Sequence, residues 1–247
     1  MKKKSKQLKW WIFAVVAFVL FVLLQIPANW LISKFSKNNQ VLTNVSGNIW
    51  QGQADWRKDQ LHGSVHWTIR PLDIFLLRLG AQVEIHSADT QLDGIIGYGF
   101  GKKLIIRQLN GQVSPETLKS LVNWQWPSNS IQLNNIKFNY QKAKGFSDAD
   151  GQLNWGGGAL VYNFAQRQER MNMPSLQGKL QNQDARLEFD IRDQRNQKMV
   201  NLLLDPDLML DVRLTQRFLL NVPSYDGKAG LDTYVISSRQ PLLGGAN

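Results

Sequence analysis

Alternation of apolar and polar residues dominates the chain beyond residue 40. Leu61–Ile69 (LHGSVHWTI) has apolar residues at every second position, and residues 131–140 repeat this with a slip at Asn134–Asn135 that predicts a bulge. Residues 187–191 and 208–214 alternate in the same way. Strands with one apolar and one polar face are typical of antiparallel sheets, since buried parallel strands are apolar throughout. The pattern therefore predicts a mainly β fold with a largely antiparallel sheet.

A short glycine-containing phrase recurs on these segments. Its form is L-x-G-x-[VL], with glycine at positions 63, 111 and 178 and close variants at 94 and 151. Glycine weakens a strand, so its recurrence at matching points predicts bends or bulges, which a long curved sheet of similar hairpins requires. The alternative is that each glycine marks a β-turn.

Three short helices are expected outside the N-terminal region. Residues 71–79 begin with proline, residues 114–122 have Ser114 as a cap with Pro115 just inside the start, and residues 215–222 end before Pro223. Each is too short to be stable alone, so we expect them to rest on the ends of the sheet or on a membrane face.

The N-terminal region predicts a membrane anchor. Residues 10–24 (WWIFAVVAFVLFVLL) contain no polar side chain, and an α-helix from Leu8 to Ile32, kinked at Pro27, would cross a hydrocarbon core of ~30 Å. A cleaved signal peptide is the alternative. The apolar run is long for one, however, and no A-x-A triplet precedes a plausible cleavage site.

Basic residues cluster before this run. Five lysines within the first nine positions account for half of the formal net charge of +10, so the high isoelectric point does not indicate nucleic-acid binding. The positive-inside rule places this end in the cytoplasm and the rest on the other side of the membrane, which is the periplasm if the host is a Gram-negative bacterium. The predicted order is a cytoplasmic tail (1–9), a transmembrane signal anchor (10–32), a polar hinge (33–40) and a periplasmic β-rich domain (41–247).

Few residues suggest chemistry. The chain has no cysteine, which excludes disulfides, cysteine-ligated metals and thiol nucleophiles. His62 and His66 have the spacing of zinc ligands on a helix, but on a strand they lie ~13 Å apart, too far for one ion. His86 stands alone in the sequence. We expect no metal site, no cofactor and no catalytic residue.

The remaining candidate motifs have structural explanations. The acidic pairs Asp148/Asp150 and Asp205/Asp207 stand next to glycine or proline, where turns favour aspartate. Gly97–Gly101 is followed by a strand-like segment, without the helix N-terminus that would hold a phosphate. Gly156–Gly158 is interpreted as a hairpin turn between two strands.

Tryptophan is abundant in the expected β-rich domain. Large aromatic side chains on one side of a sheet usually fill a core, and the alternative is a groove for acyl chains or for a partner peptide. Exposed sheet edges also permit strand addition by another protein. The residues concerned are Trp50, Trp56, Trp67, Trp124, Trp126 and Trp155.

Several segments together resemble a known family. Residues 45–54 (VSGNIWQGQA) precede an L-x-G-x-V-x-W phrase and Arg70–Leu72, and Gly97-x-Gly99 later leads into Leu109–Gly111. With the lysine-rich start and single span, this pattern resembles the type II secretion system protein N (general secretion pathway protein N) family. The resemblance is weakest over residues 225–247. It implies an inner-membrane accessory protein of folded-protein export, with a curved, partly open sheet similar to AsmA-like lipid-handling proteins and no catalytic residues.

Three hypotheses follow. The first is a non-enzymatic component of type II secretion whose partners are other inner-membrane secretion subunits and membrane lipid, with no nucleic acid. The second is an AsmA-like lipid-binding or lipid-transfer module with an apolar groove that binds a lipid ligand. The third is a membrane-anchored hydrolase, which two acidic residues beside His86 in a cleft would favour.

Overall fold

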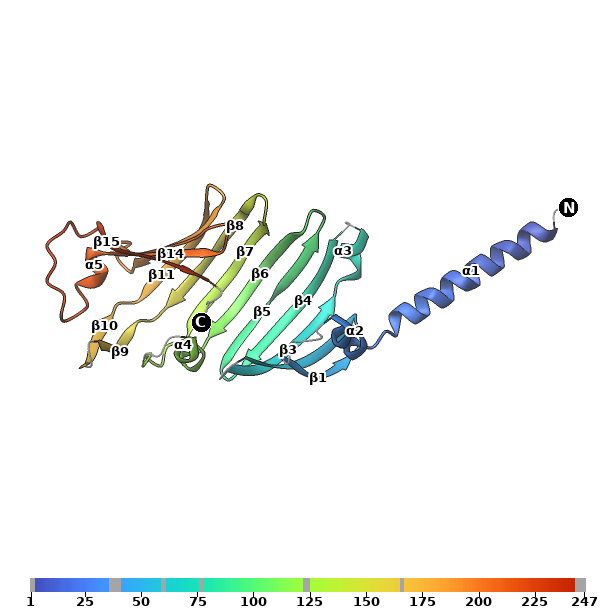
Figure 1. The fold of residues 1–247 in the computed structure, drawn as a ribbon, viewed down its shortest axis with the longest axis horizontal. Coiled ribbons are helices and arrows are strands. Elements are labelled where there is room, and N and C mark those ends of the chain that lie inside the picture. Colours follow the sequence, from blue (N-terminus) through green and yellow to red (C-terminus); the bar gives the residue numbers. More distant parts are fainter. Residues whose placement is uncertain are drawn as a thin grey trace.

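The computed structural model describes residues 3–35, 41–58, 61–75, 78–121, 125–164 and 167–242. Its main body is a curved antiparallel sheet of thirteen strands (Figure 1). These strands are β1 (Leu42–Gly47), β2 (Gln51–Lys58), β3 (Leu61–Ile69), β4 (Arg78–Ser87), β5 (Thr90–Gly99), β6 (Lys103–Val113), β7 (Ile131–Gln141), β8 (Gly145–Trp155), β11 (Leu176–Gln183), β12 (Arg186–Asp193), β13 (Lys198–Leu204), β14 (Met209–Thr215) and β15 (Tyr234–Pro241).

Strand order in space follows strand order in the chain except at one point. β8 pairs with β11, because β9 (Gly158–Phe164) and β10 (Arg167–Met173) leave the sheet and form a separate two-stranded hairpin. The predicted mainly β, antiparallel fold is confirmed. The predicted hairpin turn at Gly156–Gly158 is wrong, because this segment connects two sheets. Gly157 has a φ of +72°, and a Cβ there would lie 2.5 Å from the carbonyl oxygens of Met173 and Pro174.

The two faces of the large sheet differ sharply in polarity. The strand register aligns an unbroken row of apolar residues and glycines across β2–β15, which defines the apolar face. Its members are Ala54, Val65, Ile85, Leu92, Gly111, Leu133, Leu153, Gly178, Ile191, Val200, Leu214 and Ile236. The adjacent row defines the polar face and consists of Asp55, Ser64, His86, Gln91, Gln112, Gln132, Asn154, Gln177 and Arg192. The sequence alternation thus becomes one two-sided surface.

The recurring glycines lie inside strands, so the turn alternative is wrong. The pairing of β5 with β6 shifts at Gly94, that of β6 with β7 shifts next to Gly111, and that of β7 with β8 shifts opposite Gly151. The φ angles of Gly111 and Gly151 are +130° and +143°, which side chains with a Cβ rarely adopt. Bulges are confirmed at these three glycines, whereas pairing at Gly63 with β2 and at Gly178 stays regular.

Only part of the apolar face is covered. A cluster around Trp155, Leu160 and Met199 forms where β9 and β10 lie near the large sheet, and a second cluster surrounds Leu180. Here the sheet curls, so that the Tyr140 hydroxyl of β7 donates to the Pro206 carbonyl between β13 and β14 at 2.8 Å. The apolar row over β3–β5 is only half-buried.

The short helices lie at the ends of strands. They are α3 (Pro71–Phe75), α4 (Pro115–Leu121) and α5 (Gln216–Leu219). The predicted Ser114 cap is confirmed, because its Oγ accepts from the Thr117 amide at 3.3 Å. The helix predicted over residues 71–79 is shorter, since β4 begins at Arg78, where Nε and Nη2 both donate to Oδ1 of Asp73 and join strand and helix. The helix predicted over 215–222 is also shorter, with Thr215 as its cap.

The N-terminal region forms two helices. α1 (Lys3–Leu24) ends just before Pro27, and α2 (Ala28–Phe35) follows. Within the part of the chain that the structure describes, no helix has both the length and the apolar character to cross a membrane. The anchor at residues 10–32 therefore stays a prediction. Part of the expected polar hinge at 33–40 is helical, since α2 extends to Phe35, and the rest of it lies outside the described residues.

Candidate interaction surfaces

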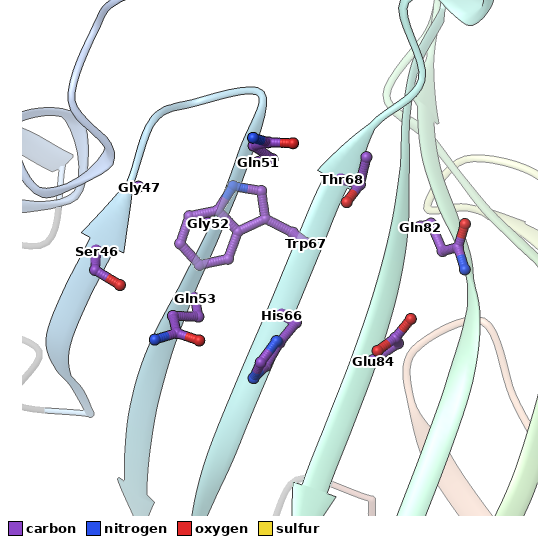
Figure 2. A pocket seen from close by; sticks show the side chains of 10 residues that line it. All are labelled: Ser46, Gly47, Gln51, Gly52, Gln53, His66, Trp67, Thr68, Gln82 and Glu84. Atoms are coloured by element: carbon purple, nitrogen blue, oxygen red, sulfur yellow. The ribbon is translucent and has the colours of Figure 1, made fainter.

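An open hollow of about 380 Å³ lies over the neighbouring strands β1–β4 (Figure 2). The indole of Trp67 lies across Gly52, where a Cβ would approach the ring to 2.4 Å. The other lining side chains are mostly polar, among them His66 and Glu84. Such a surface can donate and accept hydrogen bonds, but it does not exclude water from a ligand.

The structure brings together two histidines that the sequence separates. The rings of His66 and His86 are 6.1 Å apart at a near-perpendicular angle, and both side chains are exposed. His86 thus has a neighbour that its place in the sequence does not reveal, and His62 is exposed on the same strand as His66, as expected. No group of three or more His, Asp or Glu residues gathers to hold a metal ion within the described ranges.

The environment of His86 bears on the hydrolase hypothesis. Its cross-strand neighbours are Ser64 and Gln91, neither of which is acidic. Glu84 lies opposite His66 and Asp93 opposite Glu84, but these side chains are all exposed to solvent. Catalytic acids and bases depend on partial desolvation to shift their pKa values, and this row lies open. The arrangement gives the hydrolase hypothesis no support.

The two acidic pairs have different environments. Asp205 and Asp207 lie in the turn between β13 and β14, as predicted, and the Asp207 carboxylate accepts from the Met209 amide at 3.2 Å. Asp148 and Asp150 lie inside β8 next to the bulge, so their predicted turn is wrong. Lys137 lies 3.1 Å from Asp150 and lowers the pKa of that carboxyl through a hydrogen bond and its charge.

Ion pairs cover the polar face over β12–β15. Arg192 pairs with Asp190 on β12, and Arg213 pairs with Asp211 on β14, each at 2.7 Å. Burial alone would raise the pKa of Asp211, but hydrogen bonds from Arg213 and Ser237 outweigh it and lower the pKa. These ion pairs were not predicted from the sequence. The phrases Asp-Ile-Arg and Asp-Val-Arg do signal them, because residues two apart on a strand share a face.

The tryptophans divide between core and surface. Trp155 is buried, and its indole donates to the Asn129 carbonyl at 3.1 Å and meets Trp126 edge-on, which confirms the core interpretation for this residue. Trp50 lies between β1 and β2, Trp56 on β2 and Trp67 on β3, and all three are half-buried. Trp124 lies outside the described residues.

The glycine-rich segment Gly97–Gly101 forms the end of β5 and the following turn. β6 begins two residues later, so a strand rather than a helix follows the segment, as expected. At the other side of the sheet, β15 pairs with β14 only, within the residues described. This leaves an open edge of eight residues that another strand could join.

Comparison with known proteins gives one match. The family model described as "Type II secretion system (T2SS), protein N" matches residues 38–218, well over half of the chain. The match begins before β1 and ends within α5, so it includes the whole sheet except β15. No curated protein and no solved structure matches the chain.

Proposed function

Because the chain belongs to the type II secretion system protein N family, we propose that it is a non-enzymatic accessory component of that apparatus in the inner membrane. Its role is in the export of folded proteins from the periplasm. The observation that carries the proposal is the family match over residues 38–218. This family is an accessory secretion component rather than a known enzyme family, and membership implies interaction with other secretion subunits.

In this proposal the predicted anchor, residues 10–32, crosses the membrane once and holds the sheet on the periplasmic side; α1 forms most of this anchor. Support comes from the apolar side chains around the helix. Trp10, Trp11, Phe13, Phe18 and Phe21 are each more than half exposed. A helical stretch that is apolar all round, as residues 10–24 are, suits a lipid environment better than water. The lysines within the first nine positions, before the apolar stretch, favour a cytoplasmic N-terminus.

Cysteine labelling tests this topology, since the natural chain contains no cysteine. Ser5→Cys and Gln194→Cys variants are treated in spheroplasts with a maleimide that does not cross membranes. We expect labelling at position 194 in intact spheroplasts, and at position 5 only after lysis. Labelling at position 5 before lysis would contradict the proposed orientation.

A deletion tests the role in export. Removing the gene is expected to make an exported enzyme accumulate in the periplasm, and the wild-type chain should restore its release. A photo-crosslinking residue at Ile236, on the open edge strand β15, should capture another secretion subunit. The same residue at Asp89, in the turn between β4 and β5, is the control. Normal export by the deletion strain would refute the proposal.

A lipid-binding module is the second candidate, and one observation favours it. Over β3–β5 the apolar row of Val65, Ile85 and Leu92 is only half-buried, although the face is filled near Trp155. A photoactivatable phospholipid should crosslink to this face, and Leu92→Glu should abolish the crosslink. Its neighbour on the polar face provides the matched control, Gln91→Glu. Equal crosslinking in both variants would exclude this candidate.

A further inference from the structure

One end of the strands β1–β6 lies next to the α1–α2 junction, and we call it the anchor end. The Ile49 amide, between β1 and β2, donates to the Ile26 carbonyl at 3.1 Å, and Pro27 forms a bridge with Asn48. The Ile69 amide donates to the Trp50 carbonyl at 2.6 Å, so β3 ends there too.

The antiparallel register brings two more segments to the same end. β3 leads through α3 into the start of β4, and Figure 1 shows α3 at the end of the sheet from which α1 projects. Arg78 at the start of β4 pairs with Gly99 at the end of β5, and Gly99 pairs with Lys103 of β6. The β5–β6 turn therefore also lies at the anchor end.

Large apolar side chains are exposed at this end. Leu79 lies opposite Tyr98, and their exposed fractions are 59% and 52%, while Leu72 on α3 reaches 76% and Phe100 in the β5–β6 turn 77%. We call these four residues the anchor-end patch. Such grouping of exposed aromatic and aliphatic side chains marks an interaction site rather than scattered surface residues.

The charge around the patch is positive. Lys102 follows Phe100 in the turn, Arg70 precedes α3, and Lys142 and Lys144 occupy the next turn along this end; all four are exposed. The nearby carboxylate, Asp73, is buried and already bonded to Arg78 and 3.6 Å from Arg70. At the opposite end of these strands, the turn between β4 and β5 carries an exposed acidic residue, Asp89.

We propose that the anchor-end patch is a second membrane contact, made with an anionic bilayer surface. Tyr98, Phe100 and Leu79 enter the boundary between headgroups and acyl chains, and Lys102 and its neighbours contact the phosphates. Aromatic side chains favour this boundary, and each cation near an anionic surface strengthens binding. The patch thus complements α1 and holds the sheet at a fixed tilt. The inference rests on the membrane anchoring proposed above.

The position of the patch favours a bilayer over a protein partner. The anchor end is the end tied by hydrogen bonds to the segment that follows α1, so a bilayer that the proposed anchor crosses lies nearest to it. β5 has ten residues, so the turn at its other end lies roughly 30 Å away at ~3.3 Å per residue. One hairpin therefore offers a test position and a matched control.

Single-cysteine variants carrying a nitroxide label test the contact. Phe100→Cys, Asp89→Cys and Val16→Cys are prepared in the full chain, which has no natural cysteine, and reconstituted in vesicles of phosphatidylethanolamine and phosphatidylglycerol. Oxygen collides more with labels in lipid, and a water-soluble nickel chelate more with labels in water. We expect labels at 16 and 100 to be in lipid and the label at 89 in water.

The outcomes separate the two proposals. A label in lipid at 16 with an aqueous label at 100 overturns the second contact and leaves the anchor intact. Aqueous labels at both positions overturn the anchor and the contact together. If the label at 100 is in water in vesicles and is shielded from water only in native membranes, a protein covers it, and this result also overturns the bilayer contact.

A charge variant tests the headgroup component. Lys102→Gln should lower the ratio of lipid-inserted to aqueous label at position 100 about fivefold, since one cation at an anionic surface contributes about 1 kcal/mol. Lys119→Gln, on α4 at the opposite end, is the control and should leave the ratio unchanged. Equal effects of the two variants, or no loss of insertion in vesicles of phosphatidylcholine alone, would contradict the proposed role of charge.

Discussion

Replacing Gly111 by alanine tests whether the strand glycines are required by backbone geometry. Gly111 has a φ of +130°, and a Cβ there would lie 2.0 Å from the Gln91 carbonyl oxygen of the neighbouring strand. Holding a residue with a Cβ in such a conformation costs about 1–3 kcal/mol. The overlap also forces β5 and β6 apart, and each ladder hydrogen bond lost adds about 1 kcal/mol. We expect Gly111→Ala to lower the free energy of unfolding by about 3 kcal/mol.

Urea denaturation of the full chain in detergent micelles, followed by tryptophan fluorescence, measures this loss. The expected shift of the midpoint is roughly 1–2 M urea. Gly97→Ala is the matched control on the adjacent strand, because its nearest contact is Ile105 Cβ at 3.4 Å and its φ is ordinary. It should leave stability unchanged or raise it by about 0.5 kcal/mol. Equal midpoints for the two variants would refute the geometric account.

Three further predictions concern single side chains. Leu180→Ala should cost about 3 kcal/mol of stability because the residue is fully buried, whereas Leu79→Ala at the exposed patch should cost less than about 0.5 kcal/mol in micelle denaturation. Because the pKa of Asp211 is lowered from 3.8, its ionised carboxylate stabilises the fold at pH values above 3.8, and this stabilisation is lost as the pH falls through the lowered pKa. The difference in unfolding free energy between the wild type and Asp211→Asn should therefore be largest at neutral pH and disappear in acid. A difference that grows in acid would contradict this. Burial and the hydrogen bond to Glu169 raise the pKa of Tyr162 to about 12, so absorbance titration should show a late step that Tyr162→Phe removes and Glu169→Gln moves to lower pH.

Local features of the sequence predicted local features of the fold. The alternation in Leu61–Ile69 became a strand with those bounds, and the slip at Asn134–Asn135 became a bulge in which Asn135 has a φ of 49°. Ser114 caps α4 because hydroxyl and amide lie within one turn of each other. In each case the residues that decide the structure are neighbours in the chain.

Features that depend on distant pairing were not predictable in this way. Gly156–Gly158 resembles a hairpin turn, but whether the next strand stays in the sheet depends on β11 taking the place beside β8. The contact of His66 with His86 and the exposure of Phe100 likewise follow from the register of β3–β6. Register results from the sum of many cross-strand contacts, which one strand's sequence does not contain.

The near-identity of strand order in space and in the chain has a consequence for biogenesis. A chain emerges from the ribosome N-terminus first, and each new strand here finds its partner already exposed beside it. The sheet can thus form strand by strand from β1 to β8. Each pairing closes only a short loop, so it costs little conformational entropy. This order is interrupted after Trp155. The backbone groups at the edge of β8 stay unpaired until the β9–β10 hairpin and then β11 have been synthesised. That interval is the step at which an unfinished molecule is most exposed to pairing with the wrong strand.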